Sequence, residues 1–331
     1  MLTLTTLLLM CHQQQASDLH LSCGHPPYLR IDGDLTALAH PRLTPTLMNQ
    51  LQAQALNPPQ AQWLKQQGAV DFAYTSDFGQ RFRGHAFEQC LGPSLAFRYL
   101  NPKPPSLAAL HAPPALASFS HAHQGLILCT GPTGSGKSTT LAALIATINQ
   151  HQQKHILTLE APIEYLHQSD QSLIQQRDLG LESEALAAAL NQALRADPDV
   201  LVLGELRDLN SIRLALTAAE TGHLVLATLH SASAAQTIHR ILDVFPDGEK
   251  NLIQAQLAAS LVAIVSQTLV KKKQQPGRIA AFEVLINTPA IAHLIRERKV
   301  VQIPTILQTQ QAQGMQTMAQ ALARLSQQQL I

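Results

Sequence analysis

One run of residues has the types and the spacing needed to bind phosphate. It fits the pattern Gly-x-x-x-x-Gly-Lys-Ser/Thr, and its members are Gly131, Pro132, Thr133, Gly134, Ser135, Gly136, Lys137 and Ser138. An apolar, strand-like run (126–129) precedes it, and a helix-like run begins at Thr139. Glycines let backbone N–H groups point inward at an anion, and the helix N-terminus adds partial positive charge. We predict a nucleotide site in which residues 131–139 surround the phosphates, Lys137 reaches the terminal ones and the Ser138 hydroxyl holds Mg²⁺.

Acidic side chains follow two other apolar runs. Glu205 comes after the run 200–203, and the pair Glu160 and Glu164 follows the run 155–159. Ligands of α/β proteins bind at the carboxyl ends of the strands, so we expect these carboxylates near the phosphates. We predict that Glu205 organises Mg²⁺, and that a carboxylate of the second group orients and deprotonates the attacking water. Glu164 is also compatible with a plain surface position.

A third strand-like run, 223–228, is followed by His230. In a RecA-like core this residue, like Thr228, would face the γ-phosphate and sense whether it is present. His223, at the start of the same run, fits a core histidine paired to backbone equally well.

Composition argues against several other functions. The chain has 331 residues, 46% of them hydrophobic and 14% charged, with a formal net charge of +1. No field of one sign results, and aromatic residues make up only 4%, so we expect no nucleic-acid partner. The four cysteines, Cys11, Cys23, Cys90 and Cys129, form no C-x-x-C pair. That pattern favours a reducing compartment over a zinc site or a disulfide framework.

The apolar segment 1–11 resembles a targeting signal only in part. It lacks a basic start and a small-residue cleavage site, and it is much shorter than a membrane span. We interpret it as a buried first helix, with a secretion or lipid-attachment signal as the alternative. No other apolar stretch has the length of a bilayer crossing, so we expect no direct membrane insertion and any membrane association through a partner.

Prolines divide the chain into two predicted domains. They are dense in residues 101–118, and because proline interrupts helices and central strands we place a linker there. Residues 1–100 contain short alternating runs and turn signals at Asp32–Gly33 and Asp77–Gly79, which is typical of a small α+β domain. Residues 119–331 alternate apolar strand-like runs with helix-like runs, which is typical of an α/β domain with a buried parallel sheet.

The expected strands are 19–21, 28–31, 72–74, 81–87, 126–129, 155–159, 200–203 and 223–228, and the expected helices are 183–195, 210–220 and most of 288–330.

Seven other segments also carry recognisable motifs: 16–21, 26–33, 157–160, 195–208, 218–230, 290–297 and 314–318. Together with the phosphate loop they resemble the twitching-motility retraction ATPases of type IV pili, within the secretion ATPase superfamily of P-loop NTPases. The segments 157–160, 195–208 and 218–230 are similar to the Asp box, the Walker B region and the His box of that family. The resemblance covers nearly the whole chain.

The resemblance implies a RecA-like P-loop NTPase core, a smaller N-terminal α+β domain of PAS-like form, and a homohexamer that hydrolyses ATP with Mg²⁺. It implies ATP between the two domains, with N-terminal arginines closing on the phosphates. Arg81 and Arg83 lie in segments similar to those arginine positions, and Arg98 is left open between this role and a surface charge. An arginine suits this task because its planar fork can neutralise charge spread over the γ-oxygens. Glu160 corresponds to the proposed general base of the family.

The implied function is ATP-driven retraction of a type IV pilus. The implied partner is an inner-membrane platform protein, so the expected location is the cytoplasm, peripheral at the inner membrane. One alternative is a pilus-assembly or type II secretion ATPase, although those proteins generally carry an extra N-terminal domain and a tetracysteine zinc module. The other alternative is a regulatory ring that binds ATP without hydrolysing it. The support for this second alternative is one departure from the family pattern, Ala161 in place of the usual Asp.

Overall fold

The computed structural model describes residues 2–31, 33–100, 103–179, 185–273 and 277–331. The chain divides between Lys103 and Pro104 into two compact units, and the short stretch Ala161–Leu166 groups with the first of them. We call these units the N-terminal domain and the core domain. The predicted segments 1–11, 26–33, 101–118 and 183–195 each extend to residues outside the described ranges, namely 1, 32, 101–102 and 183–184.

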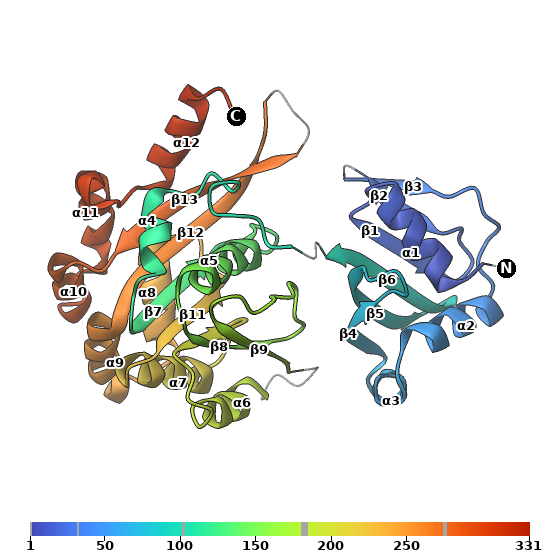
Figure 1. Cartoon of the computed structure of the whole chain (residues 1–331), viewed down its shortest axis with the longest axis horizontal. Coiled ribbons are helices and arrows are strands. Elements are labelled where there is room, and N and C mark those ends of the chain that lie inside the picture. Colours follow the sequence, from blue (N-terminus) through green and yellow to red (C-terminus); the bar gives the residue numbers. More distant parts are fainter. Residues whose placement is uncertain (1, 32, 101–102, 180–184, 274–276) are drawn as a thin grey trace. The chain divides into compact units, whose positions relative to one another are not determined.

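The N-terminal domain is an antiparallel sheet packed against helices (Figure 1). Among the described residues its strands follow the order β3-β2-β1-β6-β5-β4. Its elements are α1 (Leu4–Gln13), β1 (Asp18–Ser22), β2 (Tyr28–Ile31), β3 (Asp34–Ala37), α2 (Pro45–Ala55), α3 (Pro58–Gln67), β4 (Ala69–Thr75), β5 (Arg81–Gln89) and β6 (Gly92–Leu100). The buried first helix is confirmed, since α1 carries Leu4, Leu7, Leu8 and Cys11 into the core at helical spacing.

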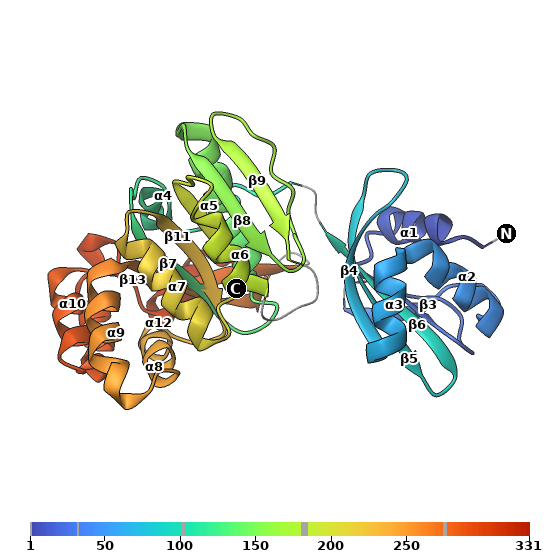
Figure 2. The same ribbon diagram turned by 90° about the horizontal axis from the view of Figure 1, so that it is seen from below.

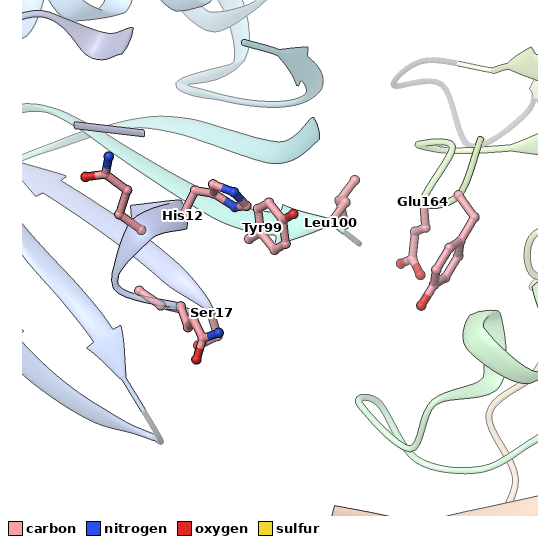
Figure 3. Close-up of a pocket in the computed structure, with 9 residues that line it drawn as sticks. His12, Ser17, Tyr99, Leu100 and Glu164 are labelled. Carbon is pink, nitrogen blue, oxygen red and sulfur yellow. The ribbon is translucent and has the colours of Figure 1, made fainter. Parts of the chain in front are cut away.

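Aromatic rings form the centre of this domain. Phe97 of β6 makes edge-to-face contacts with Phe72 and Phe82, at centroid distances of 5.9 and 6.4 Å. At the end of the same strand, the ring of Tyr99 lies beside that of His12 from α1, with centroids 5.4 Å apart (Figure 3). The Phe72 ring occupies the space in front of Gly84, where a Cβ atom would come within 2.3 Å of it.

The core domain is a mixed sheet between two layers of helices. In the part of the chain that the structure describes, the strand order is β13-β12-β7-β11-β10-β8-β9, and Figure 2 shows β9 beside β8 at one edge. Neighbouring strands from β12 to β9 are parallel, whereas β13 runs antiparallel to β12. Its elements are α4 (Pro114–Phe119), β7 (Gly125–Thr130), α5 (Lys137–His151), β8 (His155–Glu160), β9 (Leu173–Asp178), α6 (Ala185–Ala193), β10 (Val200–Leu203), α7 (Leu209–Glu220), β11 (Leu224–Leu229), α8 (Ala234–Asp243), α9 (Asp247–Ser260), β12 (Leu261–Lys271), β13 (Arg278–Ile286), α10 (Pro289–Arg296), η1 (Val300–Gln302), α11 (Ile303–Thr309), η2 (Gln311–Gln313) and α12 (Met318–Gln327).

Alternate residues of the central strands face opposite helix layers. Ile127 and Cys129 of β7 pack with α4 and α5 on one face. Leu126 and Leu128 of the same strand pack with helices α6 to α11 on the other face. Because both faces are covered, the strands are apolar throughout, as the sequence predicted. The predicted fold class, a RecA-like core with a smaller N-terminal α+β domain, is confirmed.

The outer edge of β13 is closed by a single residue of the C-terminal segment. Gln316 and Val284 exchange both backbone hydrogen bonds, at 3.1 and 2.9 Å. The side-chain Nε2 of Gln316 also donates to the carbonyl of Phe282 at 2.7 Å. The segment after residue 288, which the sequence predicted as helical, therefore also supplies a non-helical cap for the sheet.

Most predicted elements are present, and several others were missed. The expected strands correspond to β1, β2, β4, β5, β7, β8, β10 and β11, and the expected helices to α6, α7 and the C-terminal helices. The elements that the sequence analysis did not predict are β3, β6, β9, β12, β13, α2, α3, α4, α8 and α9. All four cysteines are free thiols. Within the described residues, no helix combines the length and the apolar character that crossing a bilayer would require.

His167 lies in the connection between β8 and β9. Its backbone N–H donates to Oε1 of Gln176 at 2.8 Å. Burial lowers the pKa of its imidazole from 6.5 to about 4, because the charged form loses its hydration. His167 is therefore neutral in the folded protein at neutral pH.

We expect Gly84→Ala to destabilise the N-terminal domain by about 1–3 kcal/mol, because the added methyl group overlaps the buried Phe72 ring. Trp63, the only tryptophan of the chain, packs against this domain's core, so its fluorescence during urea unfolding measures the effect. Gly248→Ala is the matched control, since nothing lies within 4 Å of its Cβ position. Equal unfolding midpoints for the wild type and Gly84→Ala would show that the ring moves aside at no cost.

We expect His167→Gln to reduce the loss of stability in mild acid. The pKa of His167 is lower in the folded state than in the unfolded state, so between pH 6.5 and about 4 the unfolded chain binds more protons. The wild type then loses stability as the pH falls through this window, and the variant lacks that contribution. Urea unfolding followed by circular dichroism at several pH values measures it, with the exposed His239→Gln as control. Parallel pH curves for His167→Gln and the wild type would contradict the expectation.

Candidate nucleotide site

The phosphate loop joins β7 to α5, and its conformation depends on glycine. Gly131, Gly134 and Gly136 have φ angles of 147°, 74° and 88°, a region that residues with a side chain rarely adopt. Gly136 is also the N-cap of α5 and provides no side chain to cap the helix. The first backbone N–H groups of α5 are thereby left for an anion rather than for a capping oxygen. Pro132, Thr133 and Gly134 form the exposed crest of the loop.

Lys137 lies folded over this loop. Its side chain is buried, and Nζ donates to the carbonyls of Gly131 and Pro132 at 2.9 and 3.0 Å. The same ammonium group lies 3.4 Å from Nδ1 of His230. The neighbouring predicted residues Ser138 and Thr139 stand half-buried in the first turn of α5.

The structure brings Glu205 and His230 to the same place. Glu205 follows β10 and His230 follows β11, the strand beside β7. Nε2 of His230 lies 3.0 Å from Oε1 of Glu205, while Oε2 accepts from Nη2 and Nε of Arg207 at 2.7 and 2.8 Å. We call the group of Lys137, His230 and Glu205 the charge cluster.

Glu160 stands at the end of β8, the strand next to β10, and thus at the same edge of the sheet. Its Oε1 accepts from Oγ1 of Thr158 at 2.8 Å and from Nε2 of Gln176 at 3.3 Å. Gln176 belongs to β9 and in turn accepts from the backbone of His167. These donors orient the carboxylate, and neither of them was predicted. Thr158 could have been inferred from its position two residues before Glu160, because that spacing puts both side chains on one face of a strand.

The other predicted residues lie apart from the charge cluster or have simpler roles. Thr228 Oγ1 donates to the carbonyl of Gly204, so it ties β11 to the residue before Glu205. His223 Nδ1 lies 3.1 Å from the carbonyl of Ala218, which supports the alternative of a histidine paired to backbone.

Arg81 and Arg83 alternate on β5 of the N-terminal domain, so their side chains leave the same face of its sheet. Arg81 is buried and Arg83 is half-buried. Arg98, opposite Arg83 on β6, donates from Nε to Oδ1 of Asp18 at 2.8 Å. Because directly opposite residues share a face of a sheet, Arg98 leaves the same face as Arg81 and Arg83, and it forms an ion pair with Asp18 there.

A second group missed by the sequence analysis lies beneath the loop. Gln267 of β12 is buried, and its Nε2 donates to the carbonyl of Ser135 at 2.6 Å. The preceding residue, Ser266, accepts from Oγ1 of Thr130 at 2.8 Å, and both side chains are buried. Burial raises the pKa of the adjacent Cys129 thiol to about 12, so this cysteine is an inert part of the floor.

Comparison with known proteins places these features in a family. Residues 3–330 match the family model described as Type II/IV secretion system protein. The chain is 51% identical over 309 residues to the Uncharacterized protein YggR of Escherichia coli, covering 93% of this chain and 94% of that protein. It is 45% identical over 322 residues to the Type IV pilus retractation ATPase PilT of Pseudomonas aeruginosa, covering 97% and 93%.

Among solved structures, the crystal structure of the pilus retraction motor PilT with bound ADP superposes with a TM-score of 0.92 at 42% identity. That similarity covers 100% of this chain and 95% of the other. The match of the family model over nearly the whole length, the RecA-like sheet and the phosphate loop agree, and the chain belongs to the type II/IV secretion system protein family.

Proposed function

We propose that this protein is an ATP-hydrolysing motor that drives retraction of a type IV pilus. The observation that carries the proposal is the charge cluster, in which Lys137, His230 and Glu205 meet at the ends of three adjacent strands beside a complete phosphate loop. The near full-length similarity to PilT supports the choice of retraction among the activities of the family.

In the proposed site, residues 131–139 surround the phosphates, with the backbone N–H groups of residues 133–139 as donors, and Lys137 moves from the loop carbonyls to the β- and γ-phosphates. Oxygen donors suit Mg²⁺, and the structure offers the Ser138 hydroxyl and the Glu205 carboxylate. Glu205 is already held by His230 and Arg207, which fixes the direction of its oxygens. When bound, Mg²⁺ would neutralise charge on the phosphate oxygens.

Glu160 is the proposed general base, and His230 the proposed sensor of the γ-phosphate. Thr158 and Gln176 orient the Glu160 carboxylate, which supports a position fixed in advance for accepting a proton from water. His230 contacts both the phosphate-binding lysine and the acidic residue, so a ligand that moves Lys137 removes one of its two contacts. That change is a direct signal of occupancy.

The wider proposal concerns assembly. By similarity to the family, we propose a homohexamer in which Arg81 and Arg83 close the site on the γ-phosphate, with the domain boundary in the proline-rich segment. The proposed partner is an inner-membrane platform protein of the pilus, which would place this protein in the cytoplasm at the inner membrane. Neither nucleic acid nor direct insertion into the bilayer has a part in this proposal.

We expect the purified protein to hydrolyse ATP when Mg²⁺ is present. Lys137→Ala removes the buried ammonium group and should abolish ATP binding. Glu205→Ala and Glu160→Gln should keep nucleotide binding but lose turnover, the latter by roughly 10²–10⁴-fold, because a general base contributes that much. Phosphate release measures turnover, and calorimetry with ADP measures nucleotide binding.

The exposed Asp243→Asn of the core domain, outside the segments shared with the family, is the control and should keep wild-type turnover. Normal turnover in both Glu205→Ala and Glu160→Gln would refute the assigned roles. Tight ATP binding without turnover in the wild type would favour the regulatory ring, for which the exposed Ala161 beside Glu160 is the motive.

We expect Arg81→Ala and Arg83→Ala to lower turnover by at least roughly tenfold, because an arginine that neutralises transition-state charge contributes 10³-fold or more in related chemistry. Arg81→Lys keeps the charge at this buried position but loses the planar fork, so it should restore little activity. Steady-state kinetics measures the change, and the exposed Arg42→Ala of the same domain is the control.

If the arginines complete a site shared within a hexamer, activity per chain should rise with protein concentration as the oligomer forms. Sedimentation of the same samples reports the oligomer. A fully active monomer, or full activity in both alanine variants, would overturn this part of the proposal.

A further inference from the structure

Gln267 of β12 contacts the phosphate loop at several points from outside the loop itself. Its Nε2 lies 2.6 Å from the carbonyl oxygen of Ser135, and its backbone carbonyl lies against Gly131. A Cβ atom on Gly131 would come within 2.3 Å of that carbonyl, and one on Gly136 would lie 3.0 Å from Nε2. Two of the glycines of the motif therefore rest directly on this one residue of β12.

The hydrogen bond has a consequence for the backbone of the loop. The peptide group that joins Ser135 to Gly136 is planar and trans, so its C=O and its N–H point in opposite directions. Because Gln267 holds the Ser135 carbonyl toward β12, the Gly136 N–H is turned away from the sheet. An N–H in that orientation, at the N-cap of α5, is available to a phosphate oxygen.

The Gln267 side chain contacts the loop through its donor, Nε2, and not through its amide oxygen. Within the described part of the chain, Oε1 of Gln267 and Oγ of Ser135 are buried without a hydrogen-bond partner. A buried polar atom without a partner costs free energy, which an apolar side chain of the same size would avoid. The gain that offsets this cost is the bond from Nε2 to the loop.

We propose that Gln267 is a positioning residue that fixes the Ser135–Gly136 peptide group and so pre-forms the phosphate site before nucleotide arrives. The proposal rests on the proposed function in one respect, that the loop binds the phosphates of ATP and ADP. Its specific content is that a side chain of β12, 132 residues distant in the sequence, sets the affinity of the loop for phosphate.

The test replaces Gln267 with Met in the full-length protein, because Met has nearly the same shape but no N–H donor. We expect the Kd for ADP and the KM for ATP to rise by the same factor, about tenfold, because the peptide group binds phosphates that both ligands contain. Turnover at saturating ATP should stay within about threefold of the wild type, because binding is lost equally in the ground and transition states. Calorimetry and steady-state kinetics give the three values.

Gln254→Met is the matched control. Gln254 is equally buried in the same domain, where its Nε2 donates to the carbonyl of Ile295 at 3.3 Å and its Oε1 accepts from Nε of Arg298 at 2.9 Å. Gln254→Met should lower the thermal unfolding temperature at least as much as Gln267→Met while leaving ADP affinity unchanged. A merely structural role for Gln267 predicts the same result for both variants.

Gln267→Asn is a second variant that keeps the amide but is one methylene group shorter, so its donor stops short of the Ser135 carbonyl. It should weaken ADP binding as the Met variant does. Wild-type ADP affinity in either folded variant would overturn the inference, and so would equal losses in Gln254→Met. Failure of the wild type itself to bind ADP would instead refute the proposed function, so the two failures are distinguishable.

Discussion

A buried ammonium group is the constraint on which the nucleotide site depends. A buried charge is costly unless polar groups surround it, and Lys137 meets this need with the carbonyls of Gly131 and Pro132. The loop can offer those carbonyls only because glycine occupies its left-handed positions. A phosphate would replace two neutral acceptors with charged oxygens, and charge-assisted hydrogen bonds are roughly twice as strong. The arrangement thus satisfies the lysine without nucleotide and favours its exchange to a phosphate.

The same lysine connects elements that are distant in the sequence. Through His230 it reaches Glu205, so that residues after β7, β10 and β11 share one hydrogen-bonded group. Linked hydrogen bonds polarise one another, and removal of one partner is felt by the others. The loop is supported from below in a different way, by the uncharged side chain of Gln267. Charged groups therefore lie where the ligand arrives, while neutral groups hold the backbone that receives it.

The sequence predicted those residues of the site that belong to local patterns and missed those whose contacts join distant parts of the sequence. The glycines, Lys137 and Glu205 follow from local patterns, because parallel strands bring their carboxyl ends to one edge. Gln176 could not be found in this way, since β9 (Leu173–Asp178) is an edge strand of mostly polar residues and was not predicted as a strand. Gln267 was missed because its contact spans 132 residues and no spacing reveals it. The sequence analysis assigned no strand to β12 or β13, so the antiparallel edge of the sheet was not predicted either.

The cap on β13 bears on how the protein can associate without aggregating. An open strand edge offers unpaired N–H and C=O groups to any other extended chain, and such pairing is a common route to fibres. Gln316 occupies this edge with two backbone bonds and one side-chain bond. At the opposite edge, β9 presents Gln175, Arg177 and Asp178, whose polar side chains discourage an apolar strand from docking. Among the described residues, both edge strands of the core sheet therefore carry features that make strand-to-strand joining between copies less favourable than at a bare apolar edge.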